Sequence, residues 1–285
     1  MNLSVVVITL NEEANLGRTL ASVKPLVAGA RGEIIVVDSG STDRTVEIAR
    51  SLGATVFVEE WKGYAAQKNS SIDKATGDWI LSLDADEELD PQLQQALSEL
   101  FETMDRLSAL GKQADSVSPV VDGTAPDTDA RIGADFDGLW IPRKNEFLGR
   151  WIRHGGFWPD PKLRLFRRGR GKFESRAVHE DVQVDGITRQ IQYGALLHHS
   201  YPTLSDYIEH MNRYSSLGAE MVVAKGRLRF SVINIVLRPL ATFVYNYFFR
   251  LGFVDGREGL LLHLHHAIYV SWKYAKAWEL SHTRG

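Results

Sequence analysis

Short apolar runs alternate with segments of helical spacing over residues 3–83, and this alternation restricts the fold more than any other feature of the chain. Continuous apolar runs rich in β-branched residues are typical of parallel strands that are covered on both faces. Strands that alternate with helices predict an α/β fold with a doubly wound sheet. The four runs that we expect to form these strands are Leu3–Leu10, Glu33–Val37, Ala54–Val58 and Trp79–Leu83.

Helical patterns occupy the intervals between these runs and the segment after the last of them. Ser41 and Thr42 are suitable N-caps for the second helix. The expected helices are Asn11–Val27, a segment that ends near Leu52, Tyr64–Ala75 and Pro91–Leu110.

The rest of the chain divides into an insertion, a group of strands and a helical region. Lys112–Asp137 is rich in Asp, Gly, Pro, Ser and Thr, which predicts a disordered insertion. Short strands are expected from Gly138 to about His199. The helical segments expected after them are Leu204–Ala224, Phe230–Leu251 and Gly256–Leu280. We therefore expect an α/β domain over residues 1–200 and a helical region over residues 201–285.

Composition and the N-terminal sequence exclude several classes of protein. The chain has no cysteine, which rules out disulfide bonds and thiolate metal sites and fits a reducing compartment. The segment MNLSVVVITLNEE lacks a basic region before its apolar run, so no signal peptide is expected. The first run leads into TLNEE without a glycine-rich phosphate loop, which counts against a dinucleotide-binding or P-loop enzyme.

Polar residues follow three of the predicted strands, at Thr9–Asn11, Asp38–Asp43 and Asp84–Asp86. Ligands of parallel α/β sheets bind beyond the carboxyl ends of the strands. Asp38 leaves a buried strand where a ligand base can meet a carboxylate. A glycine-containing turn with a helix cap is the alternative, and it explains the residues after Asp38 but not Asp38 itself.

The segment Asp84–Asp90 holds five carboxylates in seven residues. Alternate residues of an extended segment point the same way, so Asp84 and Asp86 are expected to face one ion. A hard divalent cation prefers such oxygen ligands, and Mg²⁺ usually completes its shell with ligand phosphates. An acidic helix start is the alternative; the helix dipole accounts for Glu87–Asp90 but not for the two aspartates.

The stretch Gly138–Arg176 interleaves tryptophan and phenylalanine with many Arg and Lys residues. Such a stretch suits nucleic acid, and it suits a phosphorylated sugar–lipid equally, because indoles stack on sugar rings and Arg pairs with phosphate. The polar strand ends that precede it favour the second interpretation. Arg164 is our candidate substrate-binding residue here, although most of these arginines are expected in solvent or in salt bridges.

Phe230–Leu251 is very apolar, but Arg238 and Pro239 lie in its middle. A charge at the bilayer centre is costly and proline bends a helix, so an interfacial helix on an anionic membrane is favoured over a span. A buried core helix is the alternative. The spacing of His263, His265 and His266 distributes them around a helix, which argues against a metal site.

Four blocks together resemble the family 2 glycosyltransferases, inverting enzymes with the GT-A fold: VVVITLNEEANL, IIVVDSGSTDRT, GYAAQKNSSI and DWILSLDADEEL. Three later blocks resemble a narrower branch that contains the lipopolysaccharide core β-1,4-glucosyltransferases: NEFLGRWIRHGGFWPDPKLRLFRRG, VHEDVQVDG and HHSYPTLSDYIEHMNRYSSLGA. The resemblance implies a GT-A fold, a doubly wound mixed sheet with a C-terminal helical extension.

The resemblance also implies roles for residues at matching positions. Asp38 would accept a hydrogen bond from uracil, and Asp84 and Asp86 would hold the ribose side and the metal–diphosphate. The metal would be Mg²⁺ or Mn²⁺. The residues that would line the nucleotide pocket or approach the donor are Thr9, Asn11, Glu13, Lys68 and Asn69.

Inversion requires a base that takes the proton of the acceptor hydroxyl. The family pattern places an acid after a histidine, which makes Glu180 the first candidate base and Asp181 the second. His179 would touch the metal or the diphosphate. A solvent-exposed strand end is the alternative for this block.

The resemblance implies transfer of a hexose, with glucose from UDP-glucose as the expected donor, to an anionic glycolipid such as the lipopolysaccharide inner core. The expected place is the inner face of the cytoplasmic membrane, with no nucleic acid partner. The alternatives are another nucleotide sugar, a polyprenyl-phosphate acceptor, or a non-catalytic protein that binds nucleotide sugars.

Overall fold

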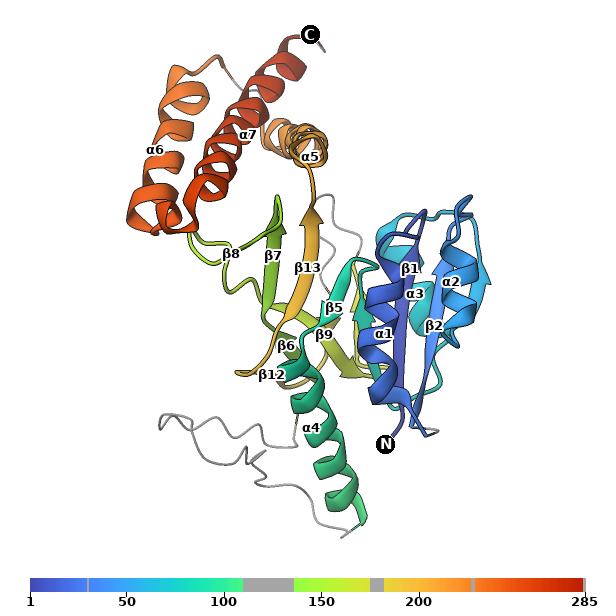
Figure 1. Cartoon of the computed structure of the whole chain (residues 1–285). Coiled ribbons are helices and arrows are strands. Elements are labelled where there is room, and N and C mark those ends of the chain that lie inside the picture. The colour runs from blue at the N-terminus through green and yellow to red at the C-terminus, as the bar shows by residue number, and fades with distance from the viewer. Residues whose placement is uncertain (30, 110–135, 175–181, 227–228, 284–285) are drawn as a thin grey trace. The chain divides into compact units, whose positions relative to one another are not determined.

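The structure is a computed structural model, shown in Figure 1, and it describes residues 1–29, 31–109, 136–174, 182–226 and 229–283. Among these residues two compact units are formed. The first unit contains residues 1–143, 161–174 and 182–198, and the second contains residues 144–160 and 199–283. One border between the units lies between residues 198 and 199, and residues 144–160 also belong to the second unit.

The first unit is built on a seven-stranded sheet with the order β12-β6-β9-β4-β1-β2-β3. Strands β1 to β4 run parallel to their neighbours among themselves, whereas β9 runs antiparallel to both β4 and β6. The prediction of an α/β fold with a mixed sheet is therefore confirmed. The strands are β1 (Leu3–Thr9), β2 (Gly32–Asp38), β3 (Thr55–Val58), β4 (Trp79–Leu83), β6 (Gly138–Ile141), β9 (Lys162–Arg167) and β12 (Thr188–Gln190).

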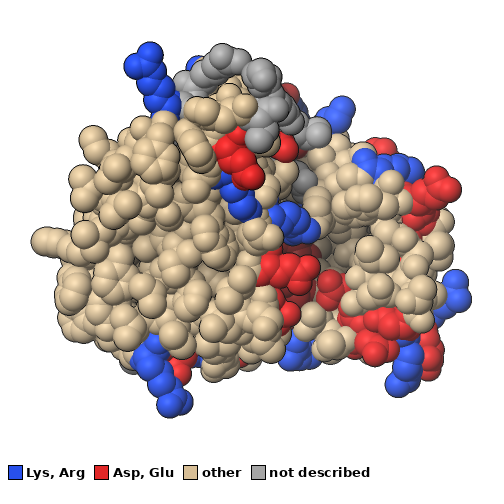
Figure 2. Space-filling view, turned by 90° about the horizontal axis from the view of Figure 1, so that it is seen from above, with Lys and Arg blue, Asp and Glu red and all other residues tan. Residues whose placement is uncertain are grey.

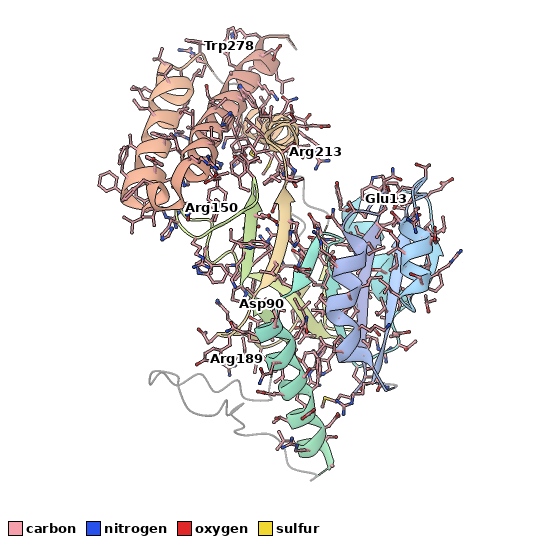
Figure 3. All side chains as sticks on the ribbon, in the orientation of Figure 1. Glu13, Asp90, Arg150, Arg189, Arg213 and Trp278 are labelled. Atoms are coloured by element: carbon pink, nitrogen blue, oxygen red, sulfur yellow. The ribbon has the colours of Figure 1, made fainter. Side chains whose placement is uncertain are left out.

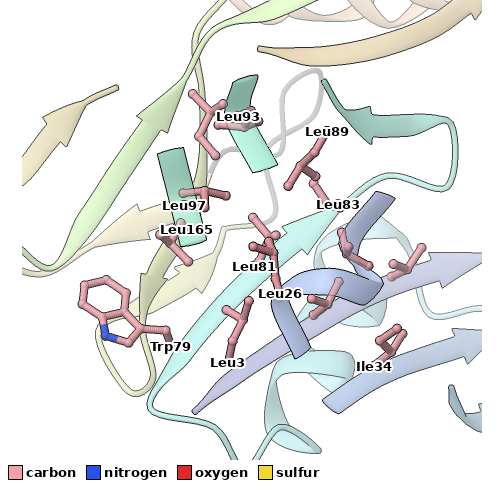
Figure 4. Close-up of a cluster of buried hydrophobic side chains, with 14 of the residues drawn as sticks. Leu3, Leu26, Ile34, Trp79, Leu81, Leu83, Leu89, Leu93, Leu97 and Leu165 are labelled. Atoms are coloured by element: carbon pink, nitrogen blue, oxygen red, sulfur yellow. The ribbon is translucent and has the colours of Figure 1, made fainter. Parts of the chain in front are cut away.

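Both faces of this sheet are buried, as the continuous apolar runs require. Val5 of β1 belongs to one apolar core, and its neighbour Val6 belongs to another, because successive side chains of a strand point to opposite faces. Leu81, Leu93 and Leu165 lie together in the larger core (Figure 4). The helices of this unit are α1 (Leu16–Val27), α2 (Thr45–Ser51), α3 (Tyr64–Asp73) and α4 (Pro91–Ala109).

Helix α2 begins later than the sequence predicts. The Ser41 hydroxyl donates to Asp38 at 2.5 Å instead of capping a helix. The Asp43 carboxylate accepts a hydrogen bond from the backbone N–H of Thr45 at 3.0 Å, where the helix starts. The expected caps, Ser41 and Thr42, were wrong because a local hydrogen bond to Asp38, three residues earlier, uses the serine hydroxyl.

The predicted insertion lies outside the described residues except for its last two positions. Phe136 is buried, and its ring centroid lies 5.0 Å from that of Trp79. The backbone N–H of Asp137 donates to the carbonyl of Ile187 at 2.7 Å. Both residues are therefore part of the folded first unit.

Three short strands complete this unit. Strand β5 (Glu87–Leu89) pairs antiparallel with residues 196–198 of β13 (Leu196–Tyr201), and β10 (Gly171–Phe173) pairs antiparallel with β11 (Val182–Val184). Strand β7 (Arg143–Phe147), which belongs to the second unit from Lys144 on, pairs antiparallel with β8 (Arg150–Ile152) over residues 145–152.

The second unit is mainly helical. Helix α5 (Leu204–Ala224) starts with a capping box between Thr203 and Asp206 and packs on α7 (Gly256–Thr283). The expected helix Phe230–Leu251 consists of a π-helix η1 (Ile233–Leu237), α6 (Arg238–Val244) and a π-helix η2 (Tyr245–Phe249). A 3-10 turn, η3 (Gly252–Asp255), leads into α7.

Pro239 explains the irregular start of α6. Proline has no N–H, so the carbonyl of Ile235 lacks its usual helical donor. The hydroxyl of Ser271 on α7 donates to that carbonyl at 2.8 Å and satisfies it. No helix within the described ranges is both long and apolar enough to cross a bilayer.

We predict that Phe136→Ala lowers the free energy of unfolding by about 3–5 kcal/mol, because it leaves a cavity against Trp79. Urea unfolding measures this loss. Ile187→Ala, at a side chain that is 44% exposed, is the control and should cost less than about 1 kcal/mol. An equally small decrease in the free energy of unfolding for both variants would contradict the packing of Phe136 against Trp79.

Candidate active site

The loops after β1 and β2 are joined through Asp38. This side chain is only 1% exposed. One carboxylate oxygen accepts from the hydroxyls of Thr9 at 2.9 Å and Ser41 at 2.5 Å, and the other accepts from the backbone N–H groups of Gly40 and Ser41 at 2.9 and 2.8 Å. A carboxylate has about four acceptor positions, and all four are used. Asp38 therefore holds the shape of the loop, and a direct contact with a base would require it to exchange one of these partners.

Asn11 and Glu13 make further links between the same loops. The side-chain carbonyl of Asn11 accepts from the backbone N–H of Thr42 at 2.9 Å, and its backbone has a φ of 55°, which asparagine tolerates. The Glu13 carboxylate accepts from the backbone N–H of Arg44 at 3.0 Å. Glu13 lies at the end of the sheet where β1 and β2 finish (Figure 3). These links fix the loop geometry at the carboxyl ends of the strands.

A buried charge cluster lies at the carboxyl end of β4. One oxygen of Asp84 accepts from Lys68 Nζ at 2.6 Å, and the other accepts from the Arg164 guanidinium at 2.5 Å. The side chains of Lys68 and Arg164 are 8% and 7% exposed. The cation that neutralises Asp84 is therefore supplied by the protein itself.

Glu87 completes this charge cluster, and its role was missed at the sequence level. Its side chain is fully buried and accepts from Arg164 at 2.6 Å and from Arg143 at 3.0 Å. Its second oxygen accepts from the backbone N–H of Asp84 at 3.1 Å. Glu87 was assigned to an acidic helix start, but it opens strand β5 and anchors two arginines.

The electrostatics of the cluster keep Asp84 ionised. Burial disfavours the charged form of this carboxyl, but the positive charges of Arg164 and Lys68 outweigh it and hold the pKa of Asp84 well below its usual range. The same carboxylates raise the pKa of Arg164 against the effect of its burial. Both groups are therefore charged over the physiological range.

Asp86 faces a different partner. Residues 84–86 form a turn rather than an extended segment, so the expected common orientation of Asp84 and Asp86 is not found. Asp86 Oδ2 lies 3.2 Å from Nε2 of His198, and both side chains are partly exposed. His198 is opposite Glu87 in the β5–β13 pairing, which brings it beside Asp86. His198 is the first residue of the block HHSYPTLSDYIEHMNRYSSLGA, but only the strand pairing shows that it lies beside Asp86.

Glu12 adds a third carboxyl to this region. Burial raises its pKa, and the negative charges of Asp86, Asp43 and Asp84 raise it further against a hydrogen bond from Asn15. The carboxyl groups of Glu12, Asp43, Asp84 and Asp86 therefore lie close enough together to influence one another.

Asn69 does not point a free amide toward this region. Its side chain donates to the carbonyl of Phe173 at 2.9 Å and accepts from the N–H of the same residue at 2.9 Å. It ties α3 to β10. The candidate base residues Glu180 and Asp181, and His179, lie outside the described residues.

Within the described part of the chain, no group of three or more His, Asp or Glu side chains is arranged to hold a metal ion. Asp86 and His198 are two side chains of this kind that lie 3.2 Å apart. Two protein ligands are sufficient for Mg²⁺-type sites, where substrate phosphates and waters supply the rest.

Comparison with known proteins gives the family. The sequence profile of glycosyl transferase family 2 matches residues 4–170. The chain belongs to this family. It is therefore a glycosyltransferase, and family 2 membership agrees with the expected GT-A class of α/β fold.

Relatives of this glycosyltransferase extend over almost the whole chain. It is 28% identical over 283 residues to LpsC, a lipopolysaccharide core biosynthesis glycosyltransferase of Rhizobium meliloti, with 97% of this chain and 92% of the relative covered. It is 30% identical over 288 residues to an uncharacterized glycosyltransferase of Rickettsia typhi, with 98% and 87% covered. A crystal structure of S. aureus TarS with UDP-GlcNAc matches at 16% identity and a TM-score of 0.45, with 100% and 92% covered.

Replacement of Arg164 tests the charge cluster. Arg164→Met should lower the free energy of unfolding by about 3–5 kcal/mol, because two carboxylates lose a buried partner. Arg170→Met is the matched control, since Arg170 pairs with Asp185 at the surface and should contribute less than about 1 kcal/mol. A loss no larger than that of the control would contradict the assigned role of Arg164.

The lowered pKa of Asp84 predicts a pH dependence. Its contribution to the free energy of unfolding is complete above the ordinary pKa of 3.8 and disappears as the pH falls toward the lower folded-state pKa. The stability difference between the wild type and Asp84→Asn should therefore be constant near neutral pH and shrink below about pH 4. Urea unfolding at a series of pH values measures it. A difference that grows as the pH falls would show the opposite sign of the shift.

Proposed function

We propose that this chain transfers glucose from UDP-glucose, with inversion, to the lipopolysaccharide inner core or a related lipid-linked saccharide. The observation that carries the proposal is the pair Asp86 and His198, 3.2 Å apart beside the carboxyl end of β4, in a chain that belongs to glycosyl transferase family 2. In parallel α/β sheets this edge is where ligands bind.

A divalent cation, Mg²⁺ or Mn²⁺, fits the residues present. Asp86 and His198 are partly exposed, and burial together with the nearby carboxylates Asp86, Asp43 and Asp84 raises the pKa of Glu12 beside them. When bound there, the cation would offset the charge that develops on the departing diphosphate. The lipopolysaccharide relative does not itself specify a metal, so this part of the proposal depends on the side chains alone.

The residues of the strand ends would bind and orient the nucleotide. Thr9, Asn11 and Glu13 hold the two loops in one geometry through the hydrogen bonds described above. Asp38 orients the loop amides, and its contact with uracil stays a prediction. A fixed loop limits the conformational cost of ligand binding.

Lys68 and Arg164 would act through Asp84. The charge cluster contains three cations, Lys68, Arg143 and Arg164, and two carboxylates, Asp84 and Glu87. Its net positive charge favours an anionic diphosphate nearby. The cluster also keeps the strand end rigid, so the direction of the Asp86 side chain is set before the donor binds.

On the acceptor side, Glu180 is proposed as the base. The acceptor oxygen forms a bond to the anomeric carbon, the bond to the diphosphate breaks, and the acceptor proton moves to the Glu180 carboxylate. The leaving nucleotide keeps the electron pair of the broken bond. Asp181 is the second candidate for the same task.

The nature of the acceptor is inferred from similarity and composition. LpsC is named for lipopolysaccharide core biosynthesis, and the match covers 97% of this chain. The basic, aromatic stretch Gly138–Arg176 suits a phosphorylated saccharide. We therefore propose an anionic glycolipid acceptor and a peripheral position on the inner face of the cytoplasmic membrane.

Transfer by the purified chain tests this function. UDP-glucose and truncated lipopolysaccharide should give UDP and a glycolipid longer by one hexose, with little UDP release when the acceptor is omitted. UDP-galactose and a polyprenyl phosphate serve as the competing donor and acceptor. Faster transfer with either would replace that part of the proposal, and binding without turnover would indicate a non-catalytic protein.

Substitution of Asp86 and His198 should weaken the metal site. We expect Asp86→Ala and His198→Ala to reduce Mn²⁺ affinity in the presence of UDP by more than about tenfold, and to abolish transfer. Electron paramagnetic resonance measures free Mn²⁺ in solution, and the bound fraction follows by difference. His199→Ala is the control, because His199 pairs with Glu146 instead. Full activity of the wild type in EDTA would remove the metal from the mechanism.

The base is tested by two isosteric changes. Glu180→Gln should lower the turnover rate by about 10²–10⁴ and leave UDP-glucose affinity nearly unchanged, because a base acts on the acceptor oxygen. Asp181→Asn should have a smaller effect. An inactive Asp181→Asn with an active Glu180→Gln would reverse the assignment.

A further inference from the structure

The second unit exposes many large apolar side chains from one short segment. Between Phe230 and Val254 most of the large apolar residues are more than a third exposed, and Phe249 and Ile233 reach 75% and 64%. Figure 2 shows a broad area of the surface without Lys, Arg, Asp or Glu. We call this segment's exposed side chains the apolar face, represented by Ile233, Val236, Leu240, Tyr245, Phe248 and Phe249.

The charged residues of this segment are all positive. The segment from Phe230 to Val254 contains no Asp or Glu, but it contains Arg238 and Arg250. Arg238 donates to the hydroxyl of Tyr274, and the Arg250 guanidinium lies against Gly156. A cluster of exposed apolar side chains is typical of an interaction surface, and the two arginines favour a negatively charged partner.

A hollow of ≈ 440 Å³ adjoins this segment at Val254. Arg150, Trp151, Arg153 and His154 line it from the β7–β8 side. Arg150 lies near the start of α7 (Figure 3), where its guanidinium donates to the carbonyl of Val254 at 3.4 Å. Val254, an exposed residue at the end of the same segment, is therefore also part of the lining of the hollow.

Most charged groups of the hollow interact with one another, and one arginine is available to bind a ligand. Asp255 accepts from the backbone N–H groups of Arg153 and His154 at 3.1 and 2.8 Å and from the His154 ring at 3.0 Å. Glu258 pairs with Arg257 at 2.8 Å and lies farther from Arg150, at 3.8 Å. The guanidinium of Arg153 is exposed and has no carboxylate partner within the described ranges.

We propose that this surface docks on an anionic bilayer: the apolar face enters the interfacial layer, and the hollow binds the phosphate of a lipid headgroup. Amphipathic helices with cationic edges bind in this way, and each basic residue near an anionic surface adds to affinity. Tyrosines such as Tyr245 suit the interface because one end is apolar and the other polar. This proposal rests on the proposed function in one respect: the glycolipid acceptor of that function lies in a membrane.

A second copy of this chain is a less suitable occupant. A contact between two apolar faces would bring Arg238 and Arg250 of both copies into one interface without a carboxylate from either segment. Like charges that approach each other oppose association. A bilayer that contains phosphatidylglycerol supplies the opposite charge over the whole area.

Vesicle sedimentation without any glycolipid tests the docking surface. The wild type should bind vesicles of phosphatidylglycerol and phosphatidylethanolamine at least tenfold more tightly than vesicles of phosphatidylcholine. The double variant Ile233→Ser/Phe249→Ser should lose at least tenfold in binding to the anionic vesicles. Both positions are mostly exposed, so the variant should fold.

Arg153→Gln tests the hollow separately. It should weaken binding to anionic vesicles by roughly fivefold, the value expected for one basic residue, and leave binding to phosphatidylcholine unchanged. Arg170→Gln, an exposed arginine of the first unit, is the matched control and should have no effect. Competition by millimolar inorganic phosphate would show that the hollow binds free phosphate rather than a lipid headgroup.

Three outcomes would overturn the proposal. They are equal binding of the wild type to anionic and neutral vesicles, no vesicle binding at all, and a double variant that loses only self-association in ultracentrifugation. The UDP affinity of each variant is measured as well. It separates a failure of the docking proposal from a failure of the proposed transferase function. Vesicle binding with no transfer to lipopolysaccharide would contradict the transferase proposal alone.

Discussion

The position of Arg164 between Asp84 and Glu87 is the interaction on which the rest of the site depends. It joins the end of β4 to β9, two antiparallel neighbours that are far apart in the sequence. Glu87 then opens β5, whose pairing places His198 opposite Glu87 and beside Asp86. A break in this cluster would therefore alter both the strand end and the proposed metal ligands.

The cluster also gives Asp84 and Asp86 different roles. Asp84 is occupied by Lys68 and Arg164, whose charges keep it ionised despite burial. Asp86 stays partly exposed and close to a histidine, so it is the carboxylate that can meet a cation. Buried ion pairs seldom add net stability compared with apolar packing, and here the arrangement gives a fixed geometry and a net positive charge near the proposed diphosphate.

Local sequence patterns predicted the helices and strands well, but they predicted the contacts between these elements less well. Strand Trp79–Leu83 and helix Leu204–Ala224 have the predicted bounds, because apolar periodicity and a capping box are encoded within each segment. The family blocks singled out Asp84 and Asp86 correctly as residues of the strand end. His198 was not found, since it reaches Asp86 through pairing with a strand about 110 residues earlier, and periodicity carries no information about partners at that separation.

The central claim is that this glycosyltransferase adds one hexose to the lipopolysaccharide core, and mass spectrometry of the core from a strain without the chain tests it most directly. The account predicts a core that lacks one hexose and any sugars attached beyond it, restored by the wild-type chain but not by Asp86→Ala. The missing residue would identify donor and acceptor together. An unchanged core, with a different glycolipid truncated instead, would contradict the claim.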